Sequence, residues 1–168
     1  MKKVILVVAF CLVLIIPAKA QNEAGLFSMS ANLSYGTEIE SLGVGLRGQY
    51  FFLDKLRGSL EYKYFIDRHN LSEWEINADA HWVFGVSQKV YLYPIGGLKF
   101  ARWTLDYGRA NIAEVDSYKK SNNRLGLNLG FGGQISLSHN TYVQIELREE
   151  FMKDYSQFVP VVGFTYEF

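Results

Sequence analysis

The sequence predicts an all-β protein: a single eight-stranded antiparallel up-and-down β-barrel that spans a membrane. Apolar and polar residues alternate with a period of two over eight segments, which is the period of a β-strand with two different faces. The final stretch, Phe158–Phe168, has apolar or aromatic residues at every second position and ends on phenylalanine. No stretch after residue 20 approaches the roughly 20 consecutive apolar residues of a transmembrane helix. Because only helices and closed barrels satisfy the backbone in lipid, a barrel is the structure that remains.

The N-terminus has the pattern of a secretory signal peptide, which we assign to residues 1–20. A basic start at Met1–Lys3 is followed by the apolar run Val4–Ile16 and the small-residue cleavage pattern Ala18–Ala20. The one cysteine, Cys11, lies inside this run, and the run continues past it, which disfavours a lipoprotein. The barrel domain then covers residues 21–168 and contains no disulfide.

The alternation is clearest from Trp74 to Val86, where Trp74 and Ile76 on one face oppose Glu75 and Asn77 on the other. A proline at Pro94 cannot donate a ladder hydrogen bond, so we expect an irregularity there. The eight predicted strands cover about residues 26–36, 42–52, 56–66, 74–86, 90–101, 124–137, 142–151 and 158–168.

The predicted connections alternate in length. Short ones cover residues 53–55, 87–89 and 138–140, and the others are longer, the longest running from about 102 to 123. Short turns at one end and longer loops at the other are typical of bacterial outer-membrane barrels, and place both termini in the periplasm. We therefore expect the longer loops to face the outside of the cell.

The face opposite the apolar one holds charges of both signs. An eight-stranded barrel is just wide enough for its interior to be filled by side chains, and isolated buried charge is costly. We therefore predict a packed polar interior with ion pairs and no open pore. Its predicted members are Arg47, Glu61, Lys63, Glu75, Asp79, His81, Lys99, Arg124, Glu146 and Arg148.

On these features, and on the terminal aromatic strand, the chain resembles small eight-stranded outer-membrane β-barrels such as the membrane domain of OmpA and OmpX. The resemblance covers the whole of residues 21–168 and is architectural. In such barrels the outer-membrane assembly machinery reads the last strand. The resemblance therefore implies that Phe164, Tyr166 and Phe168 form that signal.

A water-soluble barrel of the lipocalin type is the main alternative fold, with its apolar face turned inward around a ligand. The polar face here is rich in glycine and small residues, which suits a crowded interior. The other face carries bulky aromatics near strand ends, as an interfacial girdle does. The residues that we assign to this girdle are Tyr35, Trp74, Trp82, Phe84, Tyr142, Tyr166 and Phe168.

Enzymatic and metal chemistry have weak support. His69 lies in an expected outer loop near Ser72 and Glu73, which leaves a lipid A-modifying enzyme as the least favoured function. His81 is expected in the interior network and His139 in a short turn. Three scattered histidines have no metal-ligand spacing, and no phosphate or dinucleotide motif is present. We predict no catalytic residue, no metal and no cofactor.

The long connection mixes aromatic and charged residues, the types enriched in binding hot spots. Trp103, Tyr107, Arg109 and Tyr118 are its candidate binding residues. Exposed loops on a rigid scaffold commonly carry binding function. The competing interpretation is that two strands simply extend beyond the membrane as a solvated hairpin.

The sequence thus predicts an outer-membrane protein of a Gram-negative bacterium that acts through its outer loops. A narrow channel for small solutes is the alternative. The expected partners are membrane lipid, the barrel assembly machinery and an extracellular ligand. The 17 basic and 17 acidic residues balance, so no basic surface predicts nucleic-acid binding. A closed barrel has no free edge to pair, which predicts a monomer.

Overall fold

The structure is a computed structural model that describes residues 24–68, 71–106, 119–153 and 155–168. Regular structure in these segments consists of β-strands. They are β1 (Phe27–Gly36), β2 (Ser41–Phe51), β3 (Leu56–Arg68), β4 (Leu71–Trp82), β5 (Phe84–Gly85), β6 (Val90–Asp106), β7 (Lys119–Ser138), β8 (Thr141–Met152) and β9 (Tyr155–Glu167). The predicted signal peptide lies outside the described residues.

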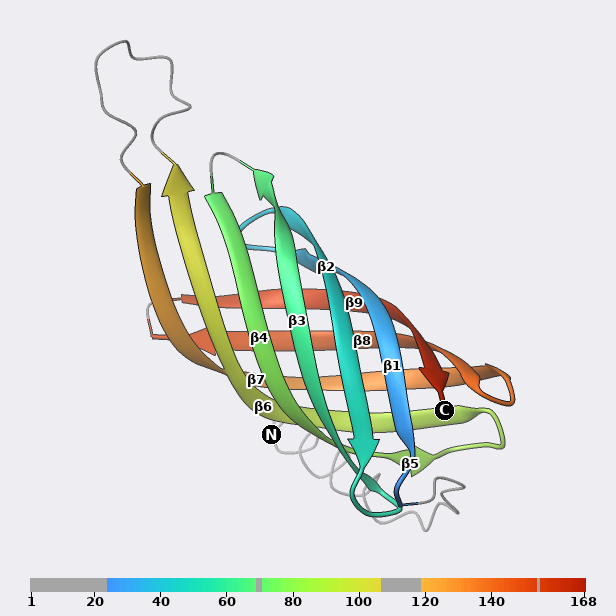
Figure 1. The fold of residues 1–168 in the computed structure, drawn as a ribbon. Coiled ribbons are helices and arrows are strands. Elements are labelled where there is room, and N and C mark those ends of the chain that lie inside the picture. The colour runs from blue at the N-terminus through green and yellow to red at the C-terminus, as the bar shows by residue number, and fades with distance from the viewer. Residues whose placement is uncertain (1–23, 69–70, 107–118, 154) are drawn as a thin grey trace, which may run out of the picture.

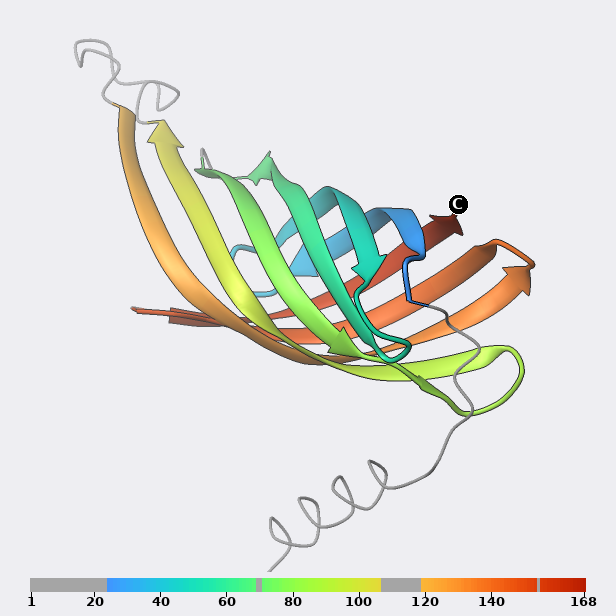
Figure 2. The ribbon, with the colours of Figure 1, turned by 60° about the horizontal axis from the view of Figure 1, so that its bottom comes forward.

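The strands form one closed antiparallel sheet (Figures 1 and 2). Strands that follow one another in the chain pair with each other, except that β4 and β5 both pair with β6, and β1 also pairs with β9, the last strand. The two-residue β5 continues β4, because both pair with β6 in the same register. Eight strand positions therefore surround the barrel, and the predicted fold is confirmed. The start of β1 and the end of β9 lie at the same end, which we call the terminal end; the opposite end is the outer end.

The break between β4 and β5 has a local cause at Pro94. The register that pairs His81 with Ile95 and Phe84 with Leu92 places Pro94 opposite Trp82. Val86 donates its N–H to the carbonyl of Val90 in the same register. Antiparallel strands bond through every second residue, so in this register the residue at position 94 would donate its N–H to Trp82. Since proline has no N–H, the hydrogen bonding between the strands is interrupted there. The predicted irregularity at Pro94 is confirmed.

The outer ends of several strands are longer than predicted. β6 continues to Asp106 and β7 begins at Lys119, so the two ends of the expected long connection, residues 102–106 and 119–123, form a paired hairpin. Only residues 37–40, 69–70 and 153–154 lie between the strands of the other outer hairpins. The expectation of longer loops is therefore wrong at these three positions, whereas the connection between β6 and β7 remains the longest. Polar residues beyond a membrane still gain ladder hydrogen bonds, although no apolar alternation marks them in the sequence.

The two faces of the barrel carry opposite chemistry. Leu33 is 62% exposed on the outside, while its neighbour Asn32 is 3% exposed inside, and this pattern recurs along β1, β2 and β8. An apolar outside and a polar inside, the reverse of the arrangement in a soluble protein, stabilise a barrel that is surrounded by hydrocarbon. Tyr142 corrects the predicted girdle, because it is buried in the interior. It alternates in step with Gln144, which is also buried.

An apolar cluster fills the interior near the terminal end. Its buried members are Phe51, Val83, Tyr91, Tyr93, Ile95 and Tyr142, and Leu26 packs against them. The remaining interior, from the middle of the barrel to the outer end, is dominated by polar and charged side chains. Near the terminal end, polar side chains such as Gln49, Arg57 and Thr165 are buried beside the apolar cluster.

Candidate functional site in the barrel interior

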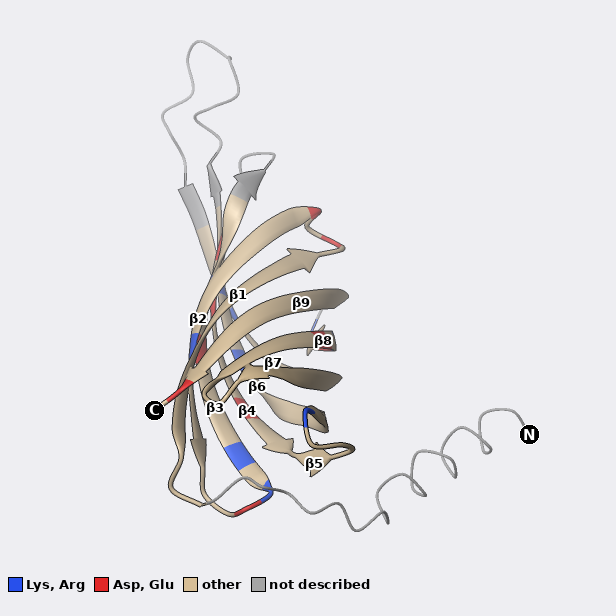
Figure 3. Ribbon diagram, turned by 90° about the vertical axis from the view of Figure 1, so that its right-hand side faces the viewer, with Lys and Arg blue, Asp and Glu red and all other residues tan. Residues whose placement is uncertain are grey.

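Figure 3 marks charged residues along the strands of the barrel. The alternation places every second side chain inside, so many of these charges are buried. They form two ionic clusters at successive levels. The central cluster joins β2, β3, β4 and β8, and the outer cluster joins β3, β4, β6 and β8. Strands on opposite sides of the barrel are thus connected through its interior.

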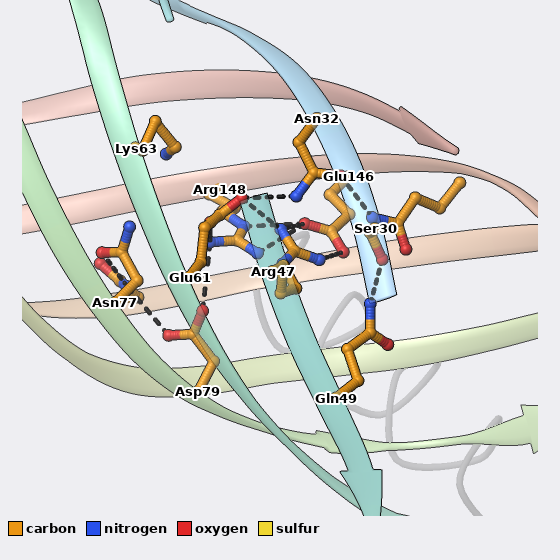
Figure 4. Close-up of polar contacts among 12 residues, drawn as sticks. Ser30, Asn32, Arg47, Gln49, Glu61, Lys63, Asn77, Asp79, Glu146 and Arg148 are labelled. Carbon is orange, nitrogen blue, oxygen red and sulfur yellow. Dashed lines mark hydrogen bonds and ion pairs between the residues drawn. The ribbon is translucent and has the colours of Figure 1, made fainter. Parts of the chain in front are cut away.

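Glu146 is the hub of the central cluster (Figure 4). Arg47 Nη1 lies 2.7 Å from Glu146 Oε1, and Arg47 Nη2 lies 3.0 Å from Oε2. Arg148 donates to Glu146 Oε2 from Nη2 at 2.6 Å and from Nε at 2.9 Å. Arg47 therefore binds both oxygens of the carboxylate in forked geometry, a strong form of such contacts, and Arg148 adds two hydrogen bonds to one of these oxygens.

Two further carboxylates complete the charge balance around the arginines. Glu61 accepts from Arg47 Nη2 at 3.1 Å and from Arg148 Nη1 at 3.2 Å. Asp79 accepts from Arg148 Nη1 at 3.1 Å. Arg47, Arg148, Glu61 and Glu146 have fully buried side chains. Buried charges are tolerated when they are paired and their remaining sites are hydrogen-bonded.

Neutral side chains add further hydrogen bonds to these carboxylates. Asn32 donates to Glu61 at 2.5 Å, and Gln144 donates to Asn32 at 2.9 Å. Asn128 donates to Asp79 at 2.9 Å, and the Tyr93 hydroxyl donates to Glu146 at 2.9 Å. The ion pairs and their amide neighbours form one network that crosses the barrel interior.

The outer cluster is built around two lysines. Lys63 Nζ lies 2.7 Å from Glu75 and 3.3 Å from Glu150. Lys99 also pairs with both of these carboxylates, and its Nζ lies 3.5 Å from Glu73 Oε1. Gln157 donates to Glu150 at 2.9 Å, as Asn77 does to Glu75 at 3.0 Å. Three carboxylates therefore share two ammonium groups.

Arg57 has a different environment, between the central cluster and the apolar cluster. Its Nε and Nη2 face His81 Nδ1 at 3.2 and 3.0 Å, and its Nη1 donates to Gln134 at 2.7 Å. The guanidinium lies 4.7 Å from the centre of the Tyr93 ring and 5.6 Å from that of Phe51. Two aromatic faces and neutral acceptors therefore stabilise this buried cation.

Glycines allow the strands to accommodate these large side chains. A Cβ on Gly97 would lie 2.7 Å from Asp79 Cα and closer still to the Asp79 carboxylate. A Cβ on Gly132 would overlap the ring of Tyr93. The small inward residues predicted for the Gly126–Gly133 stretch thus have a packing cause.

The structure buries nine of the ten predicted interior residues at 5% exposure or less, and Arg124 lies half-buried near the outer end of β7. Sequence reasoning missed Arg57 and assigned Glu73 to the loop around His69. Both residues lie inside, each at 1% exposure. Extending the alternation by two residues from Ser59 and from Glu75 would have found them. Tyr93 was hidden because Tyr91–Ile95 is apolar on both faces.

Of the predicted loop residues, the structure describes Trp103, which is half-buried in β6. Tyr107, Arg109 and Tyr118 lie outside the described residues, as does His69. The segments that are described contain no group of three side chains able to hold a metal ion. They also contain no helix long and apolar enough to cross a membrane.

The three aromatics of the last strand all face outward. Phe164, Tyr166 and Phe168 are 50%, 47% and 66% exposed. Tyr166 and Phe168 meet edge to face with ring centres 5.0 Å apart, and Phe168 donates its N–H to Phe27 at 3.0 Å. They form an exposed aromatic row beside the seam between β1 and β9.

Comparisons with known proteins agree with this architecture. The N-terminal β-barrel domain of Pseudomonas aeruginosa OprF has a TM-score of 0.66 and 17% identity, over 86% of this chain and 98% of that one. Neisserial surface protein A has a TM-score of 0.65 and 14% identity, over 85% and 95%. Ail, the attachment invasion locus protein of Yersinia pestis, has a TM-score of 0.60 and 14% identity, over 88% and 100%.

These identities show likeness of fold alone, since one fold serves many functions. No curated protein sequence matches the chain. The sequence model described as "Outer membrane protein beta-barrel domain" matches residues 6–168. The chain therefore belongs to the outer membrane protein beta-barrel domain family and is a β-barrel protein of the Gram-negative outer membrane.

Proposed function

We propose that this protein is a non-conducting outer-membrane barrel that serves a structural or surface-interaction role through its outer end, and that it is not an enzyme. The observation that carries the proposal is the buried network centred on Glu146, which links β8 to β2 through Arg47. Arg148, on β8 itself, extends the links to β3 and β4. A solute would have to separate these ion pairs.

The energetic cost of that separation supports a closed interior. The side chains of Arg47 and Glu146 have no exposed surface, and breaking a buried ion pair by removing one partner costs about 3–5 kcal/mol. The cluster around Tyr93 lies below them and packs against the guanidinium of Arg57. Its packed side chains form a second barrier in series with the ion pairs.

The outer end is the surface left for interaction. The hairpins β3–β4 and β6–β7 rise beyond the other strands there (Figure 1). Among the proteins of similar fold, one is named a surface protein and another an attachment invasion locus protein. We propose that Trp103, with Tyr107, Arg109 and Tyr118 beyond the described hairpin, contacts an extracellular ligand.

The remaining surfaces suggest three further assignments. The apolar outside, which includes Leu33, Leu60 and Leu98 at 62–63% exposure, contacts membrane lipid. The outward row Phe164, Tyr166 and Phe168 is the signal for the barrel assembly machinery. The closed sheet within the membrane favours a monomer.

Residues 1–20 act as a cleaved export signal, so the mature protein begins at Gln21. Mass spectrometry of the exported protein will test this.

Single-channel recording tests the central proposal. The full chain is refolded into a planar bilayer, and insertion is verified separately by the shift between heated and unheated protein on a gel. We expect insertion without reproducible current steps. Stable ohmic steps from the wild-type protein would overturn the closed interior and favour a narrow channel.

A double variant shows whether the central network contributes to closure. Arg47→Ser with Glu146→Ser removes one charge of each sign and leaves Arg148 beside Glu61 and Asp79. We expect it to be more permeable than Glu38→Gln, which changes an exposed turn residue.

The proposal that the protein is not a lipid A-modifying enzyme has its own test. We expect the lipid A profile of cells that express the protein to be the same as that of cells that lack it.

A further inference from the structure

A cavity of about 660 Å³ opens at the terminal end of the barrel. It lies between the turn from β5 to β6, the turn from β7 to β8 and the end of β9, which come together at this end (Figures 1 and 2). Tyr91 and Tyr142 line it and are only 5% and 8% exposed. Both belong to the apolar cluster, so packed side chains form the base of the cavity. Its volume is within the range of small-molecule binding sites.

Charged side chains of both signs line this cavity, which we call the terminal cavity. Lys89, in the turn before β6, is exposed, and so is His139, in the turn before β8. Glu167, at the end of β9, is half-buried. It interacts electrostatically with Arg57 and His139, and forms a salt bridge with neither of them. A half-buried carboxylate is therefore available to a ligand.

The strand order places Lys89 and Glu167 on different walls of the terminal cavity. Ser136 of β7 donates its N–H to the carbonyl of Lys89 at 2.8 Å, and Glu167 donates its N–H to the carbonyl of Asn140, next to β8, at 2.8 Å. Lys89 adjoins β6, so three interstrand spacings separate it from β9 along the wall. At about 4.8 Å each, they amount to roughly 14 Å.

Hydrogen bonds hold both walls in place. Ser87 Oγ accepts the N–H groups of Lys89 and Val90 at 3.3 and 3.2 Å. On the other side, the Asn140 side-chain amide donates to the carbonyl of Glu167 at 2.9 Å. A preformed site lowers the ordering cost of binding, so the two charges are presented at a fixed separation.

We propose that the terminal cavity binds a short dipolar peptide, with its ammonium group on Glu167 and its carboxylate on Lys89. An anion alone would meet the Glu167 carboxylate, and a cation alone would meet Lys89. A ligand with opposite charges at its two ends suits both walls. In the orientation expected of outer-membrane barrels, the terminal end faces the periplasm. The inference goes beyond the surface role proposed above, which belongs to the outer end.

Titration with free and blocked peptides tests the proposal. The ¹⁵N-labelled full chain in lipid nanodiscs is titrated with tri-alanine, roughly 10 Å long when extended, and amide shifts are followed by NMR. We expect saturable shifts at His139 and Glu167 and none at Glu38, at the outer end. N-acetyl-tri-alanine should bind about tenfold more weakly, because it lacks the ammonium that pairs with Glu167. Tri-alanine amide should bind about threefold more weakly, because the exposed Lys89 gives a weaker ion pair.

Single substitutions assign the two ends of the peptide. Glu167→Gln should abolish the preference for tri-alanine over its acetylated form, and Lys89→Gln should abolish the preference over the amide. Lys55→Gln, in the turn between β2 and β3 at the same end of the barrel, is the matched control and should bind like the wild type.

Three results would overturn the proposal. They are the lack of saturable shifts in the wild type, equal binding of the free and blocked peptides, and weakening by one block alone, which would indicate one end of a longer chain as the ligand. None of these results alters the conductance measurement, so a failed terminal cavity is distinguishable from a failed closed-barrel role.

Discussion

Glu146 and Arg148 lie two residues apart on β8, and Arg148 Nη2 is 2.6 Å from Glu146 Oε2. Since alternate residues of a strand share a face, both side chains enter the interior from the same strand. Arg47 then reaches Glu146 from β2 at 2.7 Å. One carboxylate thereby pairs with two buried cations that belong to strands distant in the chain.

The first prediction concerns the loss of that carboxylate. Glu146→Ala removes the carboxylate that pairs with both Arg47 and Arg148. Because buried charges then lose a partner, we expect the free energy of unfolding to fall by about 3–5 kcal/mol. Urea unfolding of the protein in lipid vesicles measures this. Glu38→Gln, in an exposed turn, should change the same quantity by less than about 0.5 kcal/mol. Equal stability of the two variants would contradict the hub role of Glu146.

The second prediction compares two buried arginines. Arg47 compensates two carboxylates, whereas the hydrogen bonds of Arg57 go to His81 and Gln134 and its guanidinium faces aromatic rings. Methionine can replace the stem of either side chain without charge. We expect Arg47→Met to destabilise the barrel by about 2 kcal/mol or more beyond Arg57→Met, measured by the same unfolding assay. The reverse order would show that Arg57 carries the larger share of the charge balance.

The third prediction uses two adjacent glycines of β6. Gly97→Ala places a methyl group 2.7 Å from Asp79 Cα, while Gly96→Ala meets nothing within 4 Å. We expect overpacking at Gly97 to cost about 1–3 kcal/mol and the change at Gly96 to leave stability unchanged or raised. Thermal unfolding in detergent will compare them. A stable Gly97→Ala variant would mean that the β4–β6 seam can separate without loss.

The fourth prediction concerns assembly. Phe168→Ala removes the last ring of the exposed row, so we expect less folded protein in the outer-membrane fraction of an expressing Gram-negative host. Phe158→Ala is the matched control, because Phe158 is 42% exposed on the same strand near its outer end. Gel mobility of heated and unheated membrane fractions measures the folded share. Equal losses in both variants would point to general lipid contact instead of a terminal signal.

The period-two pattern was sufficient to predict the strand number, the closed fold and the face of each mid-strand residue. It worked because a membrane barrel has two sharply different environments, hydrocarbon outside and packed side chains inside. Where the two environments become alike, the pattern fails. Tyr91–Ile95 is apolar on both faces because an apolar cluster fills the interior there. The outer part of β7 is polar on both faces, and its strand was missed.

The sequence by itself determined that Glu61, Glu146 and Arg148 lie inside the barrel, because alternation along one strand is a local property. Only the tertiary structure decided which charges meet. Arg47 and Glu146 are 99 residues apart in the chain, and their contact depends on barrel closure, strand register and the glycines that make room. The one-sided pairing of the outer part of β7 has the same origin, since β7 pairs with β6 from Lys119 but with β8 only from Gly126. Pairing between distant strands sets these relationships, and no local pattern encodes them.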